Sequence, residues 1–438
     1  MRRSAACFLA ALLLLSCLTL PVSAEEKPVI EHAKYAYVYN IENERELFAL
    51  NPDTPIYPAS TVKIMTAILA IENLGSDWDR KITVPEEAVK AASGSKISLR
   101  AGEVITVENL INSLIVGNAN DSALTVAILV GGSVEHFVAM MNDRAAELGA
   151  VNTHFTNPTG IHDSRMATTL RDTAIIAMHA YRMTNFMNAA GLERYNIPAT
   201  NKFKGTRYIV NKNYFVSNTV VYDYYNPLVS GMNAGNTAEA GNVVVAVAAK
   251  EGATQLIIVS GAESDENYNY AYIEAQKLMD WAFDTFDYMD ILSASRVICE
   301  IPVSLSAKVD HVILLPEHGI TQYMPSDFDP VRDVTADWTL DSPTLEAPVA
   351  RGQVCGTLRL YFEGEKIGEV NLVTQNAVDR SEWLHIMSRV KSFASRTAVR
   401  VWAVILAAVL IGYVLFMAWY REYKRSRKKK NSSYLPRI

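Results

Sequence analysis

The chain has 438 residues, of which 50% are hydrophobic and 20% are charged. A sequence of this length and apolar content can bury a large core in two domains, which excludes an intrinsically disordered protein. The 41 Lys and Arg residues and 47 Asp and Glu residues give a formal net charge of −6, and an acidic balance excludes nucleic acid as an expected partner.

The N-terminus has the pattern of a secretory signal peptide, which we assign to residues 1–24. Two arginines precede the apolar run Phe8 to Leu15, and the small residues Val22-Ser23-Ala24 form a cleavage site. Cleavage after Ala24 would remove Cys17, which disfavours the alternative of a lipoprotein anchor at that cysteine. We expect the mature chain to begin outside the cytoplasmic membrane.

Residues 25–290 are expected to form the first folded domain. It opens with two short apolar and aromatic runs, Lys34 to Tyr39 and Glu46 to Leu50, which predict a β-hairpin. Apolar residues spaced three and four apart then predict helices over Ser60–Leu74, Val107–Val116, Asp121–Val130, Val134–Leu148 and Leu170–Thr184.

The same domain ends with returning strands and a closing helix. Val243 to Ala249 and Gln255 to Gly261 are β-rich runs around Glu251-Gly252, and Tyr272 to Phe286 has helical spacing. Strands, then helices, then strands predict an α+β fold in which an antiparallel sheet packs against a helical cluster.

Ser60 and Lys63 carry the strongest chemical signal. They are three residues apart in an apolar periodic run, so a helix would place them on one face, about one turn from each other. A serine becomes a nucleophile when a neighbouring base removes its proton, and a partly buried lysine can serve as that base. The alternative is a helix N-cap serine followed by a solvated lysine. The apolar residues around Ser60 favour catalysis.

Residues 291–378 are expected to form a small all-β domain, because short apolar runs alternate there with Pro and Gly. The predicted strands are Val297–Val303, Val309–Leu315, Ala347–Gly352, Val354–Phe362 and Lys366–Val373.

Cys299 and Cys355 remain after signal removal, and either one disulfide or two free thiols is compatible with the sequence. His154 and His162 lack a third ligand, so we expect no metal site and no cofactor.

The C-terminal part has the pattern of a membrane anchor. Residues 379–400 have amphipathic spacing, residues 401–420 contain no charged side chain, and residues 421–438 are strongly basic. An apolar run of this length spans a bilayer as one helix, and the basic tail is expected to stay in the cytoplasm. We therefore expect a single-pass protein of the cell membrane whose extracytoplasmic part has a net charge near −15.

The Ser-x-x-Lys motif and further segments resemble the low-molecular-mass penicillin-binding proteins, that is, the D-alanyl-D-alanine carboxypeptidase family with its β-lactamase-like fold. Resembling segments occur in matching order over nearly the whole mature chain. They are Asn51 to Pro58, Gly94 to Glu103, Asn120 to Ala123, Phe155 to Asp163, Thr169 to Asp172 and Thr237 to Gly241, with Ala347 to Val349 and Gly364 to Gly368 in the β-rich region.

Two motifs depart from the family pattern. Asn118-Ala119-Asn120 stands where the family has Ser-x-Asn, and Asn233-Ala234-Gly235 stands where it has Lys-Thr-Gly. In the family the lysine and threonine hold the substrate's terminal carboxylate, and the serine passes a proton to the leaving group. An asparagine carries no charge and cannot relay a proton as a hydroxyl does. We therefore expect weakened activity.

The resemblance implies a serine-type carboxypeptidase that acts on peptidoglycan pentapeptide stems through an acyl-enzyme and binds β-lactams covalently. Ser60, Lys63 and Asn120 are then the expected catalytic residues. The implied substrate-binding residues are Asn118, Asn233, Ala234, Gly235 and Asn236, and the backbone N–H groups of Ser60 and Asn236 would form the oxyanion hole. The alternative is an inactive peptidoglycan-binding or scaffold protein of the cell envelope.

Overall fold

The computed structural model describes residues 27–219 and 222–431. The expected signal peptide, residues 1–24, lies outside the described residues. The chain divides into two compact units. The first contains the chain up to Tyr288 together with Tyr323–Phe328, and the second contains Met289–Gln322 and the chain from Asp329 onward.

An antiparallel sheet of five strands, in the order β2-β1-β9-β8-β7, forms the centre of the first unit. The strands are β1 (Tyr35–Asn40), β2 (Arg45–Leu50), β7 (Val229–Thr237), β8 (Gly241–Lys250) and β9 (Ala253–Ala262). The predicted β1–β2 hairpin and the β8 and β9 runs are confirmed. Strand β7, which the sequence pattern did not predict, lies at one edge of the sheet.

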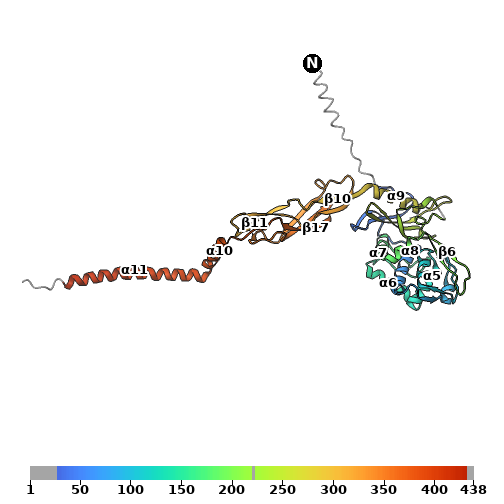
Figure 1. Ribbon diagram of the computed structural model, residues 1–438, viewed down its shortest axis with the longest axis horizontal. Coiled ribbons are helices and arrows are strands. Elements are labelled where there is room, and N and C mark those ends of the chain that lie inside the picture. The colour runs from blue at the N-terminus through green and yellow to red at the C-terminus, as the bar shows by residue number, and fades with distance from the viewer. Residues whose placement is uncertain (1–26, 220–221, 432–438) are drawn as a thin grey trace, which may run out of the picture. The chain divides into compact units, whose positions relative to one another are not determined.

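Helices cover both faces of this sheet (Figure 1). Val245, Val247 and Ile258 join a core with the helical cluster, whereas Val244 and Val259 pack with helix α9. Successive strand residues point to opposite faces, so the continuous apolar runs of β8 and β9 supply both cores. The helices are α2 (Val62–Leu74), α4 (Val107–Ile115), α5 (Asn120–Gly131), α6 (Val134–Leu148), α7 (Leu170–Tyr181), α8 (Thr184–Ala190) and, on the other face, α9 (Tyr270–Thr285).

Two of the predicted helices are interrupted. The segment predicted as Ser60–Leu74 begins as a short 3-10 helix, η1 (Ala59–Thr61), and continues as α2. The segment predicted as Leu170–Thr184 ends at Tyr181, because Met183 has an extended backbone and α8 begins after it. The small elements between the helices are β3 (Lys81–Thr83), α3 (Glu86–Ala91), β4 (Val104–Thr106), β5 (Arg194–Ile197), β6 (Arg207–Val210) and η2 (Tyr222–Tyr224).

A buried ion pair connects the two-stranded β3–β4 sheet to the two-stranded β5–β6 sheet. Arg207 Nη1 lies 2.7 Å from Glu103 Oε1, and the two side chains are 6% and 0% exposed. Thr200 also donates a hydrogen bond to this carboxylate, and the Phe203 ring lies 4.2 Å from the guanidinium carbon. Arg207 donates a further bond to the carbonyl of Ser98, so the pair also fixes the end of the 93–99 loop.

The second unit has a sheet of six strands in the order β14-β16-β17-β12-β11-β15. The prediction of a strand over Ala347–Gly352 is wrong, because in this segment only Val349 forms a β-bridge, with Val378. Pro348 has no N–H group to donate to a neighbouring strand. The strands are β11 (Cys299–Ser304), β12 (His311–Pro316), β14 (Thr335–Leu340), β15 (Leu345–Glu346), β16 (Val354–Phe362) and β17 (Glu365–Thr374), and the chain passes between the units within β10 (Phe286–Leu292) and β13 (Ile320–Pro325).

Cys299 on β11 and Cys355 on β16 are both free thiols. Two other strands, β12 and β17, lie between β11 and β16 in the sheet. Neighbouring strands are about 4.8 Å apart, so this separation exceeds the reach of a disulfide. Of the two possibilities left open by the sequence, the structure has the free thiols.

Two helices follow the second sheet. Helix α10 (Glu382–Ser395) carries exposed apolar side chains, among them Trp383, Met387 and Phe393. Helix α11 (Thr397–Asn431) has a segment long and apolar enough to cross a membrane, from Thr397 to Arg427. This helix contains the predicted span, residues 401–420.

Candidate active site

Ser60 lies in a tight turn that leaves little room around it. The preceding Ala59 has a φ of +48°, which is uncommon for a residue with a side chain. A Cβ on Gly160 would overlap the Ala59 carbonyl, and a Cβ on Gly235 would overlap the Ser60 side chain. Two glycines therefore allow the 157–163 loop and strand β7 to approach the serine from two sides.

Lys63 is buried directly behind this serine. Its side chain is 2% exposed, and its Nζ lies 3.2 Å from Ser60 Oγ and 2.6 Å from the carbonyl oxygen of Thr159. Burial lowers the pKa of Lys63 to about 7. Desolvation disfavours the charged amine, so a neutral base is available near neutral pH.

The Thr159 carbonyl was not predicted as part of the site. Asn157 fixes it: its Oδ1 accepts hydrogen bonds from the backbone N–H groups of Thr159 and Gly160 and from the Thr159 hydroxyl. Thr66, one turn after Lys63, donates a bond to the carbonyl of Pro158. These contacts hold the loop against α2, and the Asn-Pro-Thr-Gly run was the signal that could have suggested a fixed loop.

Asn118 and Asn120 line the cleft beside Ser60. The Asn118 Nδ2 donates to the carbonyl of Ala234 at 2.7 Å, and the Asn120 Nδ2 donates to the carbonyl of Ser93 at 2.7 Å. The Oδ1 atoms of both asparagines have no hydrogen-bond partner among the described residues. Both asparagines thus keep a buried side-chain oxygen that no described group satisfies. Asn118 also has a φ of +51°, a conformation that asparagine tolerates better than serine.

Strand β7 forms the opposite wall. Ala234, Gly235 and Asn236 line the cleft together with Thr237. Asn233 is 5% exposed and pairs with Val245 of β8. The residues of β7 that line the cleft begin at Ala234, one residue after it. The structure thus brings Asn118, Asn120, Ala234, Gly235 and Asn236 around Ser60 and places the Asn233 side chain in the protein interior.

Lys212 is a further residue that the sequence pattern did not single out. Its backbone N–H donates to the carbonyl of Val116, and its exposed side chain borders the cleft. Among the described residues that line this cleft, Lys212 is the one with a positive charge. The cleft has a volume of about 390 Å³ and also contacts Tyr214, Asn269 and Tyr272.

A serine hydroxyl beside a buried lysine amine, in a cleft bordered by the edge strand of an antiparallel sheet, defines a serine-nucleophile, lysine-base site for acyl transfer.

Comparison with known proteins gives the same class. The sequence profile described as D-alanyl-D-alanine carboxypeptidase matches residues 22–264, and that of the penicillin-binding protein 5 C-terminal domain matches residues 286–380. The chain is 27% identical to D-alanyl-D-alanine carboxypeptidase DacF of Bacillus subtilis, over 82% of this chain and 88% of the relative. It is 29% identical to DacA of Haemophilus influenzae, over 76% of this chain and 81% of the relative.

Comparison with solved structures gives the same class of protein. Penicillin-binding protein 5 from Haemophilus influenzae matches with a TM-score of 0.61 and 28% identity, over 81% of this chain and 99% of that one. The chain belongs to the D-alanyl-D-alanine carboxypeptidase family of serine peptidases, the low-molecular-mass penicillin-binding proteins. The resemblance inferred from the motifs and the α+β fold are both confirmed.

Proposed function

We propose that the protein removes the terminal D-alanine from peptidoglycan stem peptides through an acyl-enzyme on Ser60. The observation that carries this proposal is the 3.2 Å contact between Ser60 Oγ and the buried amine of Lys63. Lys63 forms no ion pair with an acidic group among the described residues, and the Thr159 carbonyl holds its Nζ in place. A lysine in this setting can accept a proton from the serine at neutral pH.

In the acylation step, the neutral Lys63 amine takes the Ser60 proton while Oγ forms a bond to the carbonyl carbon of the penultimate residue. The backbone N–H groups of Ser60 and Asn236 would stabilise the resulting oxyanion. The C–N bond then breaks, and the protonated Lys63 returns its proton to the departing amine. Asn118 cannot relay this proton, so Lys63 acts both as the base and as the acid. Water later releases the acyl group.

The terminal carboxylate needs a partner in a cleft that has no Lys-Thr-Gly motif. Lys212 lines the same cleft, and its backbone N–H donates a hydrogen bond to the carbonyl of Val116, two residues before Asn118, so we infer that its side chain brings a positive charge to the end of the cleft formed by Asn118 and Ala234. Lys212 would bind the carboxylate of the leaving D-alanine. Asn120, which lines the same cleft, would contact a substrate amide.

The function is tested with the full-length chain in detergent. D-Alanine release from a pentapeptide analogue and covalent labelling by a fluorescent penicillin are measured for the parent and for Ser60→Ala. We expect slow release and labelling by the parent and neither by the variant. A folded parent that releases no D-alanine, or labelling that persists in Ser60→Ala, would contradict the proposal.

The non-catalytic alternative receives no specific support. A scaffold protein would have no need of a lysine amine that is buried at a free-energy cost beside a serine. The related proteins are carboxypeptidases by name, and this chain matches them over most of their length. We therefore retain the enzyme as the function.

For the location, we propose a single-pass membrane protein with both units outside the cytoplasmic membrane. The apolar helix α11 would cross the bilayer, and its basic end would remain in the cytoplasm by the positive-inside rule. The exposed apolar residues of α10 support an additional contact of that helix with the membrane surface. We also propose that residues 25–290 form the carboxypeptidase-like domain and residues 291–378 the β-rich domain.

A further inference from the structure

Lys212, the proposed partner of the terminal carboxylate, lies in an irregular segment between strand β6 and the 3-10 helix η2. Its exposed side chain lines the catalytic cleft and carries its charge on a long, flexible stem. An ammonium on such a stem meets a carboxylate at one place at the lowest entropic cost when the backbone that bears it is fixed. The contacts of the Lys212 backbone therefore bear on substrate binding.

The hydroxyl of Tyr272 holds the backbone around Lys212. It donates a hydrogen bond to the carbonyl of Lys212 at 3.4 Å and accepts one from the N–H of Tyr214 at 3.1 Å. The N–H of Lys212 is bonded to the carbonyl of Val116, so both backbone groups of the lysine have a partner. Tyr272 is 2% exposed, and burial raises its pKa, so the hydroxyl keeps its proton and continues to donate.

Aromatic contacts place the ring of Tyr272 independently of its hydroxyl. The ring stacks on Tyr224 with centroids 4.9 Å apart and on Tyr214 with centroids 5.4 Å apart. Phe215 meets it edge-on at 4.9 Å. A phenylalanine at this position would keep these ring contacts and lose only the two hydrogen bonds. The role of the hydroxyl can therefore be separated from the packing of the ring.

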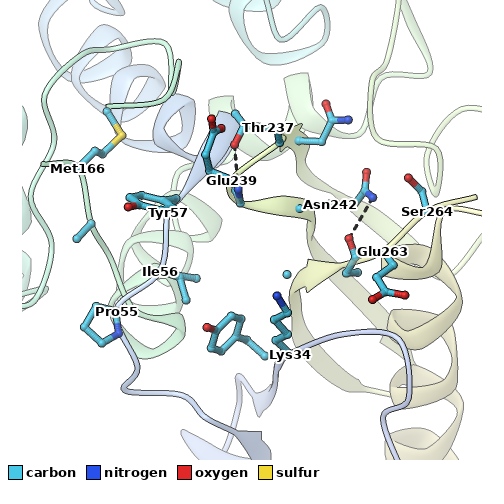
Figure 2. A pocket seen from close by; sticks show the side chains of 18 of the residues that line it. Lys34, Pro55, Ile56, Tyr57, Met166, Thr237, Glu239, Asn242, Glu263 and Ser264 are labelled. Carbon is cyan, nitrogen blue, oxygen red and sulfur yellow. Dashed lines mark hydrogen bonds between the residues drawn. The ribbon is translucent and has the colours of Figure 1, made fainter. Parts of the chain in front are cut away.

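The first turn of α9, which carries Tyr272, is tied to the central sheet. Asn269 caps this helix by accepting a hydrogen bond from the N–H of Ala271, and its Nδ2 donates to Asn242 Oδ1 at 3.2 Å. Asn242, on β8, donates in turn to the carbonyl of Ala262 at the end of β9 (Figure 2). Tyr272 is thus held by the sheet, and its hydroxyl passes this order on to a segment outside the sheet.

We propose that Tyr272 is a positioning residue for substrate binding, whose hydroxyl fixes the backbone of Lys212 so that the ammonium meets the terminal carboxylate of the peptide. The inference rests on the proposed function, because it takes the role of Lys212 from there. The hydroxyl then matters for a peptide that ends in a carboxylate and not for one that ends in a neutral group. A purely structural role would affect both peptides equally.

Binding is measured by calorimetry with the full-length Ser60→Ala variant in detergent, which makes the result independent of turnover. The probes are diacetyl-Lys-D-Ala-D-Ala, which ends in a carboxylate, and its C-terminal amide, which is neutral there. We expect the carboxylate to bind about tenfold more tightly than the amide. Adding Tyr272→Phe should reduce this preference to about twofold and leave the affinity for the amide unchanged.

Two further variants in the same background serve as controls. Tyr270→Phe removes a hydroxyl from the same helix turn, one that donates to Asp265 and lies outside the cleft lining, and it should retain the preference. Lys212→Met should abolish the preference. Adding Tyr272→Phe to Lys212→Met should then have no further effect, because both changes act through one contact.

Equal binding of the two peptides, no binding of either, a preference that survives Tyr272→Phe, or an equal loss of affinity for both peptides would overturn the positioning role. Penicillin labelling of the unmodified chain separates this result from the proposed function. A chain that is not labelled but shows a preference dependent on Tyr272 would contradict the acyl-enzyme and support the positioning role. A labelled chain whose preference ignores Tyr272 would do the reverse.

Discussion

At the scale of single residues, the chemistry of the site depends on how deeply Lys63 is buried. Its amine has the Ser60 hydroxyl and the Thr159 carbonyl as partners, and neither carries a charge that would stabilise an ammonium. Burial therefore lowers the pKa of Lys63 to about 7. The neutral amine predominates above that pH, and the charged amine predominates below it.

We predict that the rate of Ser60 acylation rises with pH through about 7 and then levels off, because acylation needs the neutral form of Lys63. The measurement is penicillin labelling of the full-length chain between about pH 5 and pH 9. Lys63→Arg stays charged over this range and should be slower by roughly a hundred- to ten-thousand-fold throughout. A flat profile in the parent would show that another group activates the serine.

Lys212 gives a second prediction at this scale. A hydrogen bond to a charged group contributes about 1.5–3 kcal/mol, so Lys212→Met should lower kcat/KM for D-alanine release by roughly tenfold or more. Lys212→Arg should retain most of the activity, since it keeps the charge. Lys204→Met removes an exposed cation outside the cleft lining and serves as the control. Equal kinetics of Lys212→Met and the control would exclude a carboxylate contact.

Residue spacing alone predicted only the contact of Ser60 with Lys63, while Asn118, Asn120 and Ala234 to Asn236 were expected from the family resemblance, and the Thr159 carbonyl and Lys212 were missed. Ser60 and Lys63 are three residues apart, so the expectation of contact needed only local helical geometry. Thr159 lies 96 residues after Lys63, and its carbonyl is a backbone group that leaves no trace in the residue type. Lys212 follows a short strand and has no motif around it.

At the scale of elements, β7 shows why a strand escaped prediction from the apolar pattern, although the family resemblance had named its residues as part of the site. Its sequence, Val229–Thr237, contains two glycines and two asparagines, residues that are depleted in strands. Pairing with the apolar β8 makes it a strand, and the missing side chain of Gly235 is what lets it approach Ser60. By contrast, α4 to α6 and the strands β8 and β9 were predicted because their apolar periodicity is strong.

The ion pair between Glu103 and Arg207 connects two small two-stranded sheets, and we predict that it stabilises the first unit. Burial raises the pKa of Glu103, but hydrogen bonds from Arg207 and Thr200 outweigh this effect and hold the pKa below its ordinary value. Breaking a buried pair costs about 3–5 kcal/mol, so Glu103→Gln should lower the free energy of unfolding by a large part of that amount near neutral pH.

A depressed pKa means that the contribution of Glu103 is present above its unfolded pKa and is lost as the pH falls through its folded pKa. The difference between the parent and Glu103→Gln should therefore shrink below about pH 4. Urea unfolding at several pH values gives the measurement. Glu86→Gln, which breaks an exposed pair with Lys90, should change stability by less than about 1 kcal/mol. Similar losses in the two variants would argue against a role for the buried pair.

At the scale of the whole molecule, α11 sets the expected topology. Its 35 residues span about 50 Å as a helix, whereas the apolar part of a bilayer is about 30 Å thick. The helix is therefore long enough to cross the membrane and continue beyond it. Protease added to intact protoplasts should degrade both units and leave a small C-terminal fragment. Full protection of the chain would contradict an exterior location.

The two separated thiols make folding of the second unit independent of the redox state of its surroundings. Cys299 and Cys355 lie on strands with two others between them, so no covalent cross-link holds that sheet together. A fragment made in a reducing cytosol should reach the same structure as one secreted into an oxidising exterior. Its melting temperature should not change when dithiothreitol is added.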